Sequence, residues 1–205
     1  IQISNEEEEK KQLIKIAIKD LKRLDRLISD ISSSSRLEVE LAKGEFDIID
    51  IRDVLKSVME VTKTNITKRM NVDINLKLPK NKIETLGIGD RIAQVFYNLI
   101  DNALSFSKEG SVIDIIATTT ENEAIIEIKD QGPGIPKENL GKIFERFYTY
   151  RPEEKSFGNN SGLGLSICKQ IIKSLNGTII ANNRLEGGSV FTVTLPLNKD
   201  RKRKK

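Results

Sequence analysis

The apolar residues near the start of the chain recur at helical spacing. From Glu6 to Lys43 there is neither Pro nor Gly, and apolar residues return every three or four positions, at Ile14, Ala17, Leu21, Leu24, Ile28 and Ile31. Leu13, Ile18 and Leu27 widen this stripe beyond the narrow seam of a two-stranded coiled coil. The pattern predicts one long helix that stops near Gly44, suited to a four-helix bundle that it can complete only with partners.

From about Glu45 the pattern alternates between strand and helix periods. It predicts, in order, a short strand at Phe46–Ile49, a helix at 51–68, a strand at Asn71–Leu78, a helix at Asp90–Phe106, a hairpin of Val112–Thr119 and Ala124–Asp130, a helix at Leu163–Asn176, and two strands on either side of Glu186–Gly188. Gly177 is the expected stop of the last helix. This order predicts an α+β fold, a two-layer sandwich of a mixed sheet covered by helices, with a helical stalk before it.

These patterns divide the chain into a bundle helix (1–44), a sandwich domain (45–198) and a basic tail (199–205). The tail carries six Lys or Arg residues and one Asp, so it accounts for more than the whole net charge of +4. The remaining residues therefore lack the basic stripe that tracks a nucleic-acid backbone, and we expect no nucleic-acid partner.

Composition limits the setting and the chemistry. No apolar run approaches the roughly 18–20 residues of a membrane span, so these residues are predicted not to be membrane-embedded. Because the sequence begins with neither Met nor a charged-then-apolar leader, we expect it to be cut from a longer protein, whose remaining part could carry a membrane anchor. The lone Cys168 falls in an apolar helix and is expected to pack there, in a reducing, cytoplasmic setting. The absence of histidine excludes His-based acid–base chemistry and most zinc sites within these residues.

Two amides fall on one face of the predicted helix at Asp90–Phe106. Asn98 and Asn102 are four residues apart, so their side chains lie together beside the apolar stripe. Amides in such a place need partners, and a hard cation with phosphates supplies them, because Mg²⁺ takes oxygen ligands. The alternative is an ordinary pair of exposed Asn residues.

A carboxylate and two glycines follow the strand at 124–130, in the run Asp130-Gln-Gly132-Pro-Gly134-Ile135. Alternation places Asp130 on the buried face of the strand, where its carboxylate needs a hydrogen-bond donor. The exocyclic amine of a purine is one such donor, and glycines permit close approach to a flat ring. The alternative is a polar strand end followed by a turn.

Two further segments flank a polar stretch at 149–161. Phe144-Glu-Arg146-Phe147-Tyr148 precedes it; Phe147 is expected to pack the loop onto the domain, and Arg146 could reach a phosphate. After it, Ser161-Gly162-Leu163-Gly164-Leu165 opens the last helix, where unpaired N–H groups and glycines form a cradle for an anion. A Gly-x-Gly alone is weak evidence, and no Gly-Lys-Ser/Thr follows that would make a Walker motif.

Taken together, in this order, the four segments resemble the nucleotide-binding domain of histidine kinases, in the superfamily that includes gyrase, Hsp90 and MutL. They match its N, G1, F and G2 boxes over about 46–197. The resemblance implies the Bergerat ATP-binding fold with ATP and Mg²⁺ as cofactors. By that match Asn102 holds Mg²⁺ with support from Asn98, and Asp130 reads the adenine amine.

The resemblance also implies the remaining site residues and the type of reaction. Arg146 would contact phosphate, the loop at 149–161 would be a mobile lid, and the other expected contacts are Phe106, Gly132, Gly134, Ile135, Phe144, Ser161, Gly162, Leu163, Gly164 and Leu165. ATP-hydrolysing relatives carry a general-base Glu at the position of Asn98. An amide cannot accept a proton in that way, so the chain is expected to hold ATP for transfer.

The leading helix indicates which transferase this is. The run at 20–32 resembles the second helix of the dimerisation and phosphotransfer bundle, in particular of kinases of the ChvG type, which implies a homodimer through this helix. The chain departs from the family at Ser105, where Lys or Arg is usual; Lys108 or Arg151 could replace the missing contact. The acceptor histidine is expected upstream of Ile1.

The expected function is therefore the kinase core of a two-component sensor. It would transfer the γ-phosphoryl of ATP to a histidine and then to an aspartate of a response-regulator receiver domain, which would bind the bundle around 24–35. Two alternatives remain: a nucleotide-binding or heterodimerising module without its own acceptor, and a serine kinase of the anti-sigma type. The latter is disfavoured because such proteins lack the bundle helix.

Overall fold

The computed structural model of the chain describes residues 10–14, 17–18, 21, 24–25, 28, 32, 45–63, 72–150 and 162–199. The described residues between 10 and 32 are all helical, and the rest of the helix predicted at 6–43 lies outside the described residues, as does Gly44. Apolar side chains of this segment are 47–64% exposed, namely those of Leu13, Ile14, Ile18, Leu21, Leu24 and Ile28. A stripe of this kind is left in water in the single chain.

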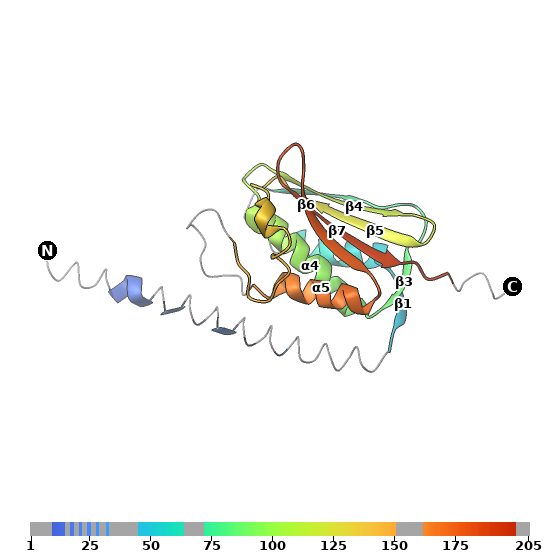
Figure 1. Cartoon of the computed structure of the whole chain (residues 1–205), viewed down its shortest axis with the longest axis horizontal. Helices are drawn as coiled ribbons and strands as arrows, with labels where there is room; N and C mark the ends of the chain where they lie inside the picture. The colour runs from blue at the N-terminus through green and yellow to red at the C-terminus, as the bar shows by residue number, and fades with distance from the viewer. Residues whose placement is uncertain are drawn as a thin grey trace.

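A five-stranded mixed sheet forms one layer of the domain (Figure 1). Its order is β2 (Asp73–Lys77), β4 (Val112–Thr119), β5 (Glu123–Lys129), β7 (Ser189–Pro196) and β6 (Thr178–Asn183). Only β2 and β4 pair in parallel, while the other neighbours are antiparallel. The predicted strands at 71–78, 112–119 and 124–130 and the two strands around 186–188 are thus confirmed, with small changes of bounds.

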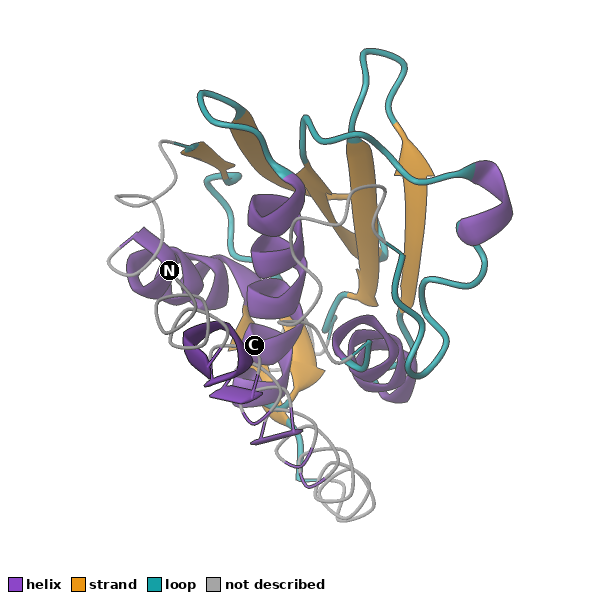
Figure 2. Cartoon of the chain, turned by 90° about the vertical axis from the view of Figure 1, so that its left-hand side faces the viewer, coloured by secondary structure: helices purple, strands orange, loops and turns teal. Residues whose placement is uncertain are grey.

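Three helices, α2 (Ile51–Thr62), α4 (Gly89–Phe106) and α5 (Gly164–Ser174), form the second layer (Figures 1 and 2). The predicted two-layer α+β fold is confirmed. Alternate residues of the central strands face the helices and are fully buried, among them Ile113 and Ile115 of β4 and Ile126 and Ile128 of β5. The apolar stripe of α4 is buried by the same core, so the remaining face of α4, which carries the amides, is left for the site.

A second, two-stranded sheet joins β1 (Asp47–Asp50) to β3 (Glu84–Gly87), antiparallel. The strand β1 was predicted at Phe46–Ile49, but β3 was not predicted, because four residues between a turn and a helix give little period. The weak signal in the sequence is a pair of β-branched residues on alternate positions, Ile83 and Thr85, both of which the structure buries.

The junction between β1 and α2 is fixed by Asp50. Its carboxylate caps α2 through Arg52 N–H at 3.1 Å and accepts from Ile83 N–H at 3.2 Å, which ties the helix start to the chain before β3. Burial raises the pKa of Asp50, but the hydrogen bonds from Arg52 and Ile83 outweigh it and hold the pKa below its usual value.

The end of α5 corrects one expectation. Gly177 was the predicted stop, but the residue with left-handed backbone is Asn176, at φ 57°. Gly177 N–H then bonds to the Ile172 carbonyl at 2.9 Å and Asn176 N–H to that of Lys173 at 3.1 Å, which closes the helix. Gly177 is required for another reason: a Cβ there would lie 2.3 Å from the carbonyl oxygen of Thr194.

Within the described residues, no helix combines the length and the apolar character needed to cross a bilayer. The short η2 (Lys137–Asn139), a 3₁₀ turn, was not predicted from sequence.

Candidate functional site

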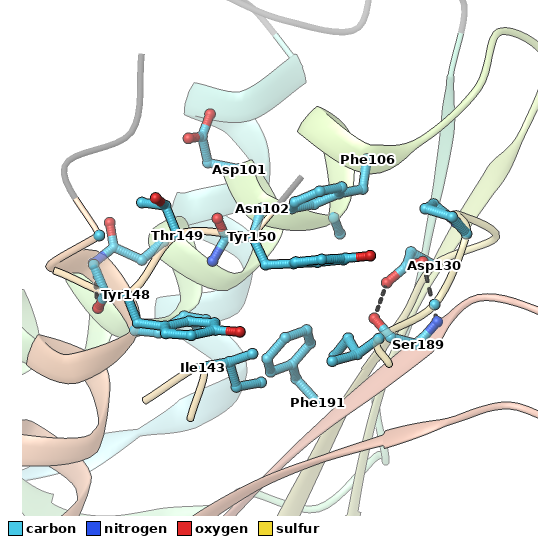
Figure 3. A pocket seen from close by; sticks show the side chains of 18 of the residues that line it. Asp101, Asn102, Phe106, Asp130, Ile143, Tyr148, Thr149, Tyr150, Ser189 and Phe191 are labelled. Carbon is cyan, nitrogen blue, oxygen red and sulfur yellow. Dashed lines mark hydrogen bonds between the residues drawn. The ribbon is translucent and has the colours of Figure 1, made fainter. Parts of the chain in front are cut away.

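A cavity of about 340 Å³ opens beside α4, and most of the expected site residues line it (Figure 3). Its volume lies within the range of roughly 300–1,000 Å³ that is usual for small-molecule sites. The expected residues that the fold brings together there are Asn98, Asn102, Phe106, Asp130, Gly134, Ile135, Gly162, Gly164 and Leu165. Gly132, Phe144, Arg146 and Leu163 lie outside the lining, and Ser161 lies outside the described residues.

The two amides of α4 line the cavity together, as their spacing predicted. The amide nitrogen of Asn98 also faces α5, 3.5 Å from the Gly164 carbonyl oxygen and 3.7 Å from the sulfur of Cys168. Asn98 therefore spans the gap between the two helices rather than standing on an exposed surface. Asp101 lines the same wall and adds a carboxylate that was not predicted as a site residue.

Asp130 lies at the end of β5 with only 3% of its surface exposed, as its place in the strand period predicted. The protein itself supplies the donors that this carboxylate needs. Oδ1 accepts from Gly132 N–H at 2.8 Å and from Ser189 N–H at 3.1 Å, and Oδ2 accepts from the Ser189 hydroxyl (Figure 3). These bonds occupy both lone pairs of Oδ1 and one of Oδ2, so Oδ2 retains one acceptor position.

Ser189 is the site residue that sequence reasoning missed. It is the first residue of β7, it is 5% exposed, and it lines the cavity beside Asp130. The backbone binds it as well, because Asp130 N–H donates to the Ser189 carbonyl at 3.0 Å. The glycines at 187 and 188 mark a hairpin turn in the sequence, but nothing there points across to Asp130.

The glycines of the site are there for different reasons. At Gly132 a Cβ would lie 2.9 Å from the Phe106 carbonyl oxygen, and at Gly162, with φ +73°, it would lie 2.7 Å from the backbone of Phe147. These two glycines are needed by the protein's own packing. Among the described residues, a Cβ at Gly164 would meet nothing closer than Asn98 at 3.8 Å, so Gly164 keeps the start of α5 open toward the cavity.

The start of α5 fits an anionic group. The helix has eleven residues, and its N-cap Leu163 forms no capping side-chain hydrogen bond. Its first N–H groups, with the helix dipole behind them, stand where Gly164 and Leu165 line the cavity. The donor set of the opposite wall, two amides and one carboxylate, has the oxygen atoms that a small divalent cation prefers when phosphates complete its shell.

The aromatic segment before 149 was only partly predicted. Phe144 is buried and packs edge-on against Phe191, with ring centres 6.3 Å apart. Phe147 was expected to pack the loop onto the domain, but its side chain is 60% exposed. The reason is backbone packing: Phe147 has φ +65° and donates its N–H to the Gly162 carbonyl at 3.0 Å, which turns the ring outward. Arg146 is also exposed.

The outer wall of the cavity comes from Tyr148, Thr149 and Tyr150. The ring of Tyr150 lies in the cavity below Phe106, and its hydroxyl points toward Asp130 (Figure 3). The stretch expected to be a lid continues from here into 151–161, which lie outside the described residues.

Comparisons with known proteins agree with this architecture. The family described as "Histidine kinase-, DNA gyrase B-, and HSP90-like ATPase" matches residues 87–199. The chain is 39% identical over 201 residues to the sensor protein ChvG of Agrobacterium fabrum, which covers 93% of this chain and 34% of the relative. It is 32% identical over 194 residues to the sensor protein SrrB of a Staphylococcus aureus strain, and this alignment covers 95% of this chain and 33% of that relative.

Solved structures give the same result. The histidine kinase AdeS of Acinetobacter baumannii superposes with a TM-score of 0.69 at 26% identity, over 91% of this chain and 85% of that one. The histidine kinase ThkA, solved in complex with the response regulator protein TrrA, gives a TM-score of 0.72 at 26% identity, over 93% and 52%. This chain spans about a third of the length of the curated relatives named above.

The thiol beside the site yields a first prediction. Cys168 is fully buried, and this burial raises its pKa from 9.0 to about 12, offset in part by the hydrogen bond from Asn98. We expect no reaction with a disulfide reagent at pH 8 in the folded chain and full reaction in guanidinium, measured by absorbance. Rapid labelling of the native chain would contradict this burial.

The same shift sets a pH dependence. The unfolded thiol ionises first, so its contribution to the free energy of unfolding is constant below pH about 9 and is lost as the pH rises from about 9 to about 12. The difference in the free energy of unfolding between wild type and Cys168→Ala, measured by denaturant titration, should change with pH only in that window, because all other titrating groups are common to both.

Proposed function

Since this chain belongs to the histidine kinase-, DNA gyrase B- and HSP90-like ATPase family, we propose that its cavity binds ATP with Mg²⁺ and that it is the kinase core of a two-component sensor. The single observation that supports this most is the remaining acceptor position on Asp130 Oδ2, at the buried end of a cavity whose other end is the start of the helix α5. An amino-bearing ring at one end and an anion at the other describe a nucleotide.

The proposed contacts follow from where each residue lies. Asp130 accepts from the adenine amine, Phe106 and Ile135 contact the ring, and the N–H groups from Gly164 onward face the phosphates. Asn102 holds Mg²⁺ with support from Asn98, and the cation, once bound, neutralises phosphate charge. Gly132, Gly134 and Gly162 shape the walls. The proposed contacts of Phe144, Arg146, Ser161, Leu163 and Leu165 rest on the family resemblance, although Leu165 also lines the cavity.

The proposed chemistry is transfer rather than hydrolysis. Asn98 stands where a general base would activate water, and its amide cannot take a proton. The residues of the cavity then act by binding, orienting the phosphates and excluding water, which is how proteins accelerate phosphoryl transfer in general. Because the sequence contains no histidine, the acceptor must lie outside these 205 residues.

The proposed assembly is a homodimer through the leading helix, with 1–44 as part of the dimerisation and phosphotransfer bundle, 45–198 as the catalytic domain and 199–205 as a tail. The exposed apolar residues between 13 and 28 support it, since such a stripe is normally covered. The proposed second partner is a response-regulator receiver domain at the bundle, around 24–35. Given the sensor relatives, we also propose that the whole protein is anchored in a membrane with this part in the cytoplasm.

Nucleotide binding tests the assignment of roles. Asp130→Asn should lower the affinity for ATP and for ADP alike, by roughly tenfold or more, because it removes the charged acceptor for the amine of the base. In the absence of Mg²⁺, Asn102→Ala should bind nucleotide with the same affinity as the wild type. In the presence of Mg²⁺, it should not show the increase in affinity that the wild type shows. Calorimetry with each nucleotide, with and without Mg²⁺, separates the two. Equal losses for both variants under all conditions would show the roles to be wrong.

Phosphotransfer tests the proposed activity. The chain is mixed with γ-labelled ATP, alone and with a complete bundle that contains the histidine and whose own nucleotide domain is inactivated. We expect acid-labile label on the added bundle only, and slowly, because tethering normally supplies the acceptor at about millimolar effective concentration. Acid-stable label on this chain would favour a serine kinase, and ATP binding without any label would favour a binding module.

Sedimentation tests the dimer. A concentration-dependent dimer is expected for this chain, and a weak one, because these residues supply one bundle helix from each copy. It should be lost when Leu24 and Ile28, 55% and 64% exposed, are both replaced by Asp, and kept in Asp25→Ala, which alters the adjacent polar position. A strictly monomeric wild type at high concentration would count against this stripe as the interface.

A further inference from the structure

The turn between β6 and β7 carries two side chains that hold the loop at 130–135 from outside the cavity. Asn183, the last residue of β6, accepts from Ile135 N–H at 2.7 Å through Oδ1 and donates to the Ile135 carbonyl at 2.6 Å through Nδ2. One amide thus satisfies both backbone groups of Ile135, as a neighbouring strand would.

Arg184 holds the other end of the same loop. Its Nη1 donates to the carbonyl oxygen of Asp130 at 2.7 Å, and its side chain is 18% exposed. Its ion pair with Glu186, at 3.4 Å, involves a carboxylate that is 86% exposed and therefore adds little. The turn also packs closely against the loop: a Cβ at Gly188 would lie 2.1 Å from the same Asp130 oxygen, so only glycine fits there.

Neither Asn183 nor Arg184 lines the cavity, but both bond to residues that do. The two points of attachment are Asp130 and Ile135, and Gly134 lies on the loop between them. The one open acceptor position on Asp130 Oδ2 is useful only if the carboxylate and the opposite wall keep their spacing, because hydrogen bonds weaken steeply with misalignment.

Building on the proposed function, we infer that Asn183 and Arg184 are positioning residues that set the selectivity of the cavity for a purine with an exocyclic amine. Their hydrogen bonds fix the loop at 130–135, so that a base with the amine gains a hydrogen bond that a base without it does not. If these hydrogen bonds only stabilised the hairpin, their loss would lower the stability of the protein and would weaken the binding of every nucleotide equally.

The test compares Asn183→Leu and Arg184→Met with the matched control Asn182→Leu. Asn182 precedes Asn183 on the same strand, is exposed, and makes no side-chain hydrogen bond that the structure shows among its described residues. Dissociation constants are measured for ATP and for inosine triphosphate, which carries an oxygen in place of the amine, together with the melting temperature.

We expect the preference for ATP over inosine triphosphate to fall about five- to tenfold in the two variants, with binding of inosine triphosphate nearly unchanged. The control should keep the wild-type preference. An unchanged preference in both variants, or an equal weakening of both nucleotides, overturns the inference while ATP binding by the wild type upholds the proposed function. A wild type that binds neither nucleotide overturns both.

A second variant covers a failure to fold. Asn183→Asp keeps the size of the side chain and the acceptor for Ile135 N–H, but it replaces the donor by a second oxygen that the Ile135 carbonyl oxygen repels, so it releases only one of the two hydrogen bonds. If Asn183→Leu is unfolded, a reduced ATP preference in Asn183→Asp supports the inference, and a wild-type preference in Asn183→Asp overturns it.

Discussion

The site depends on how one buried carboxylate is satisfied. Both main-chain polar atoms of Asp130 and both of its carboxylate oxygens form hydrogen bonds, and most of the partners belong to the β6–β7 turn or to the first residue of β7. A carboxylate that is 3% exposed is costly unless it is bonded in this way. Sheet order makes it possible, because antiparallel pairing of β5 with β7 places Lys129 opposite Val190 and so brings the end of one strand to the start of the other.

Two walls of the cavity lie on either side of Asp130. The loop after Asp130 is held by Asn183 and forms one wall, while α4 forms the other with its amide face. Asn98 links that wall to the start of α5, and Gly162 lets the chain pass closely over Phe147 before α5 begins. The cavity is thus bounded by helices and strands whose positions the core sets and by a loop that hydrogen bonds hold, and its other end is the start of α5.

Much of this arrangement was predictable. The helix at 89–106 and the hairpin at 112–129 have long, regular periods, so both their type and their buried faces followed from the sequence. The placement of Asn98 and Asn102 on the face of α4 that lines the cavity, and of Asp130 on the buried face of its strand, also followed, because faces are set by period alone. The short β3 and η2 were missed because three or four residues carry too little period, and Phe147 was misjudged because its exposure comes from a backbone contact with Gly162.

What the sequence determined by itself was local: which residues form each element, which face they bury, and which polar residues stand at the ends. What only the tertiary structure decided was pairing over distance. Ser189 meets Asp130 across 59 residues, Asn183 meets Ile135 across 48, and Arg184 meets Asp130 across 54. None of these partners has a periodic signal, since a hydrogen bond between distant residues is set by sheet order and register, and these emerge only when the whole core packs.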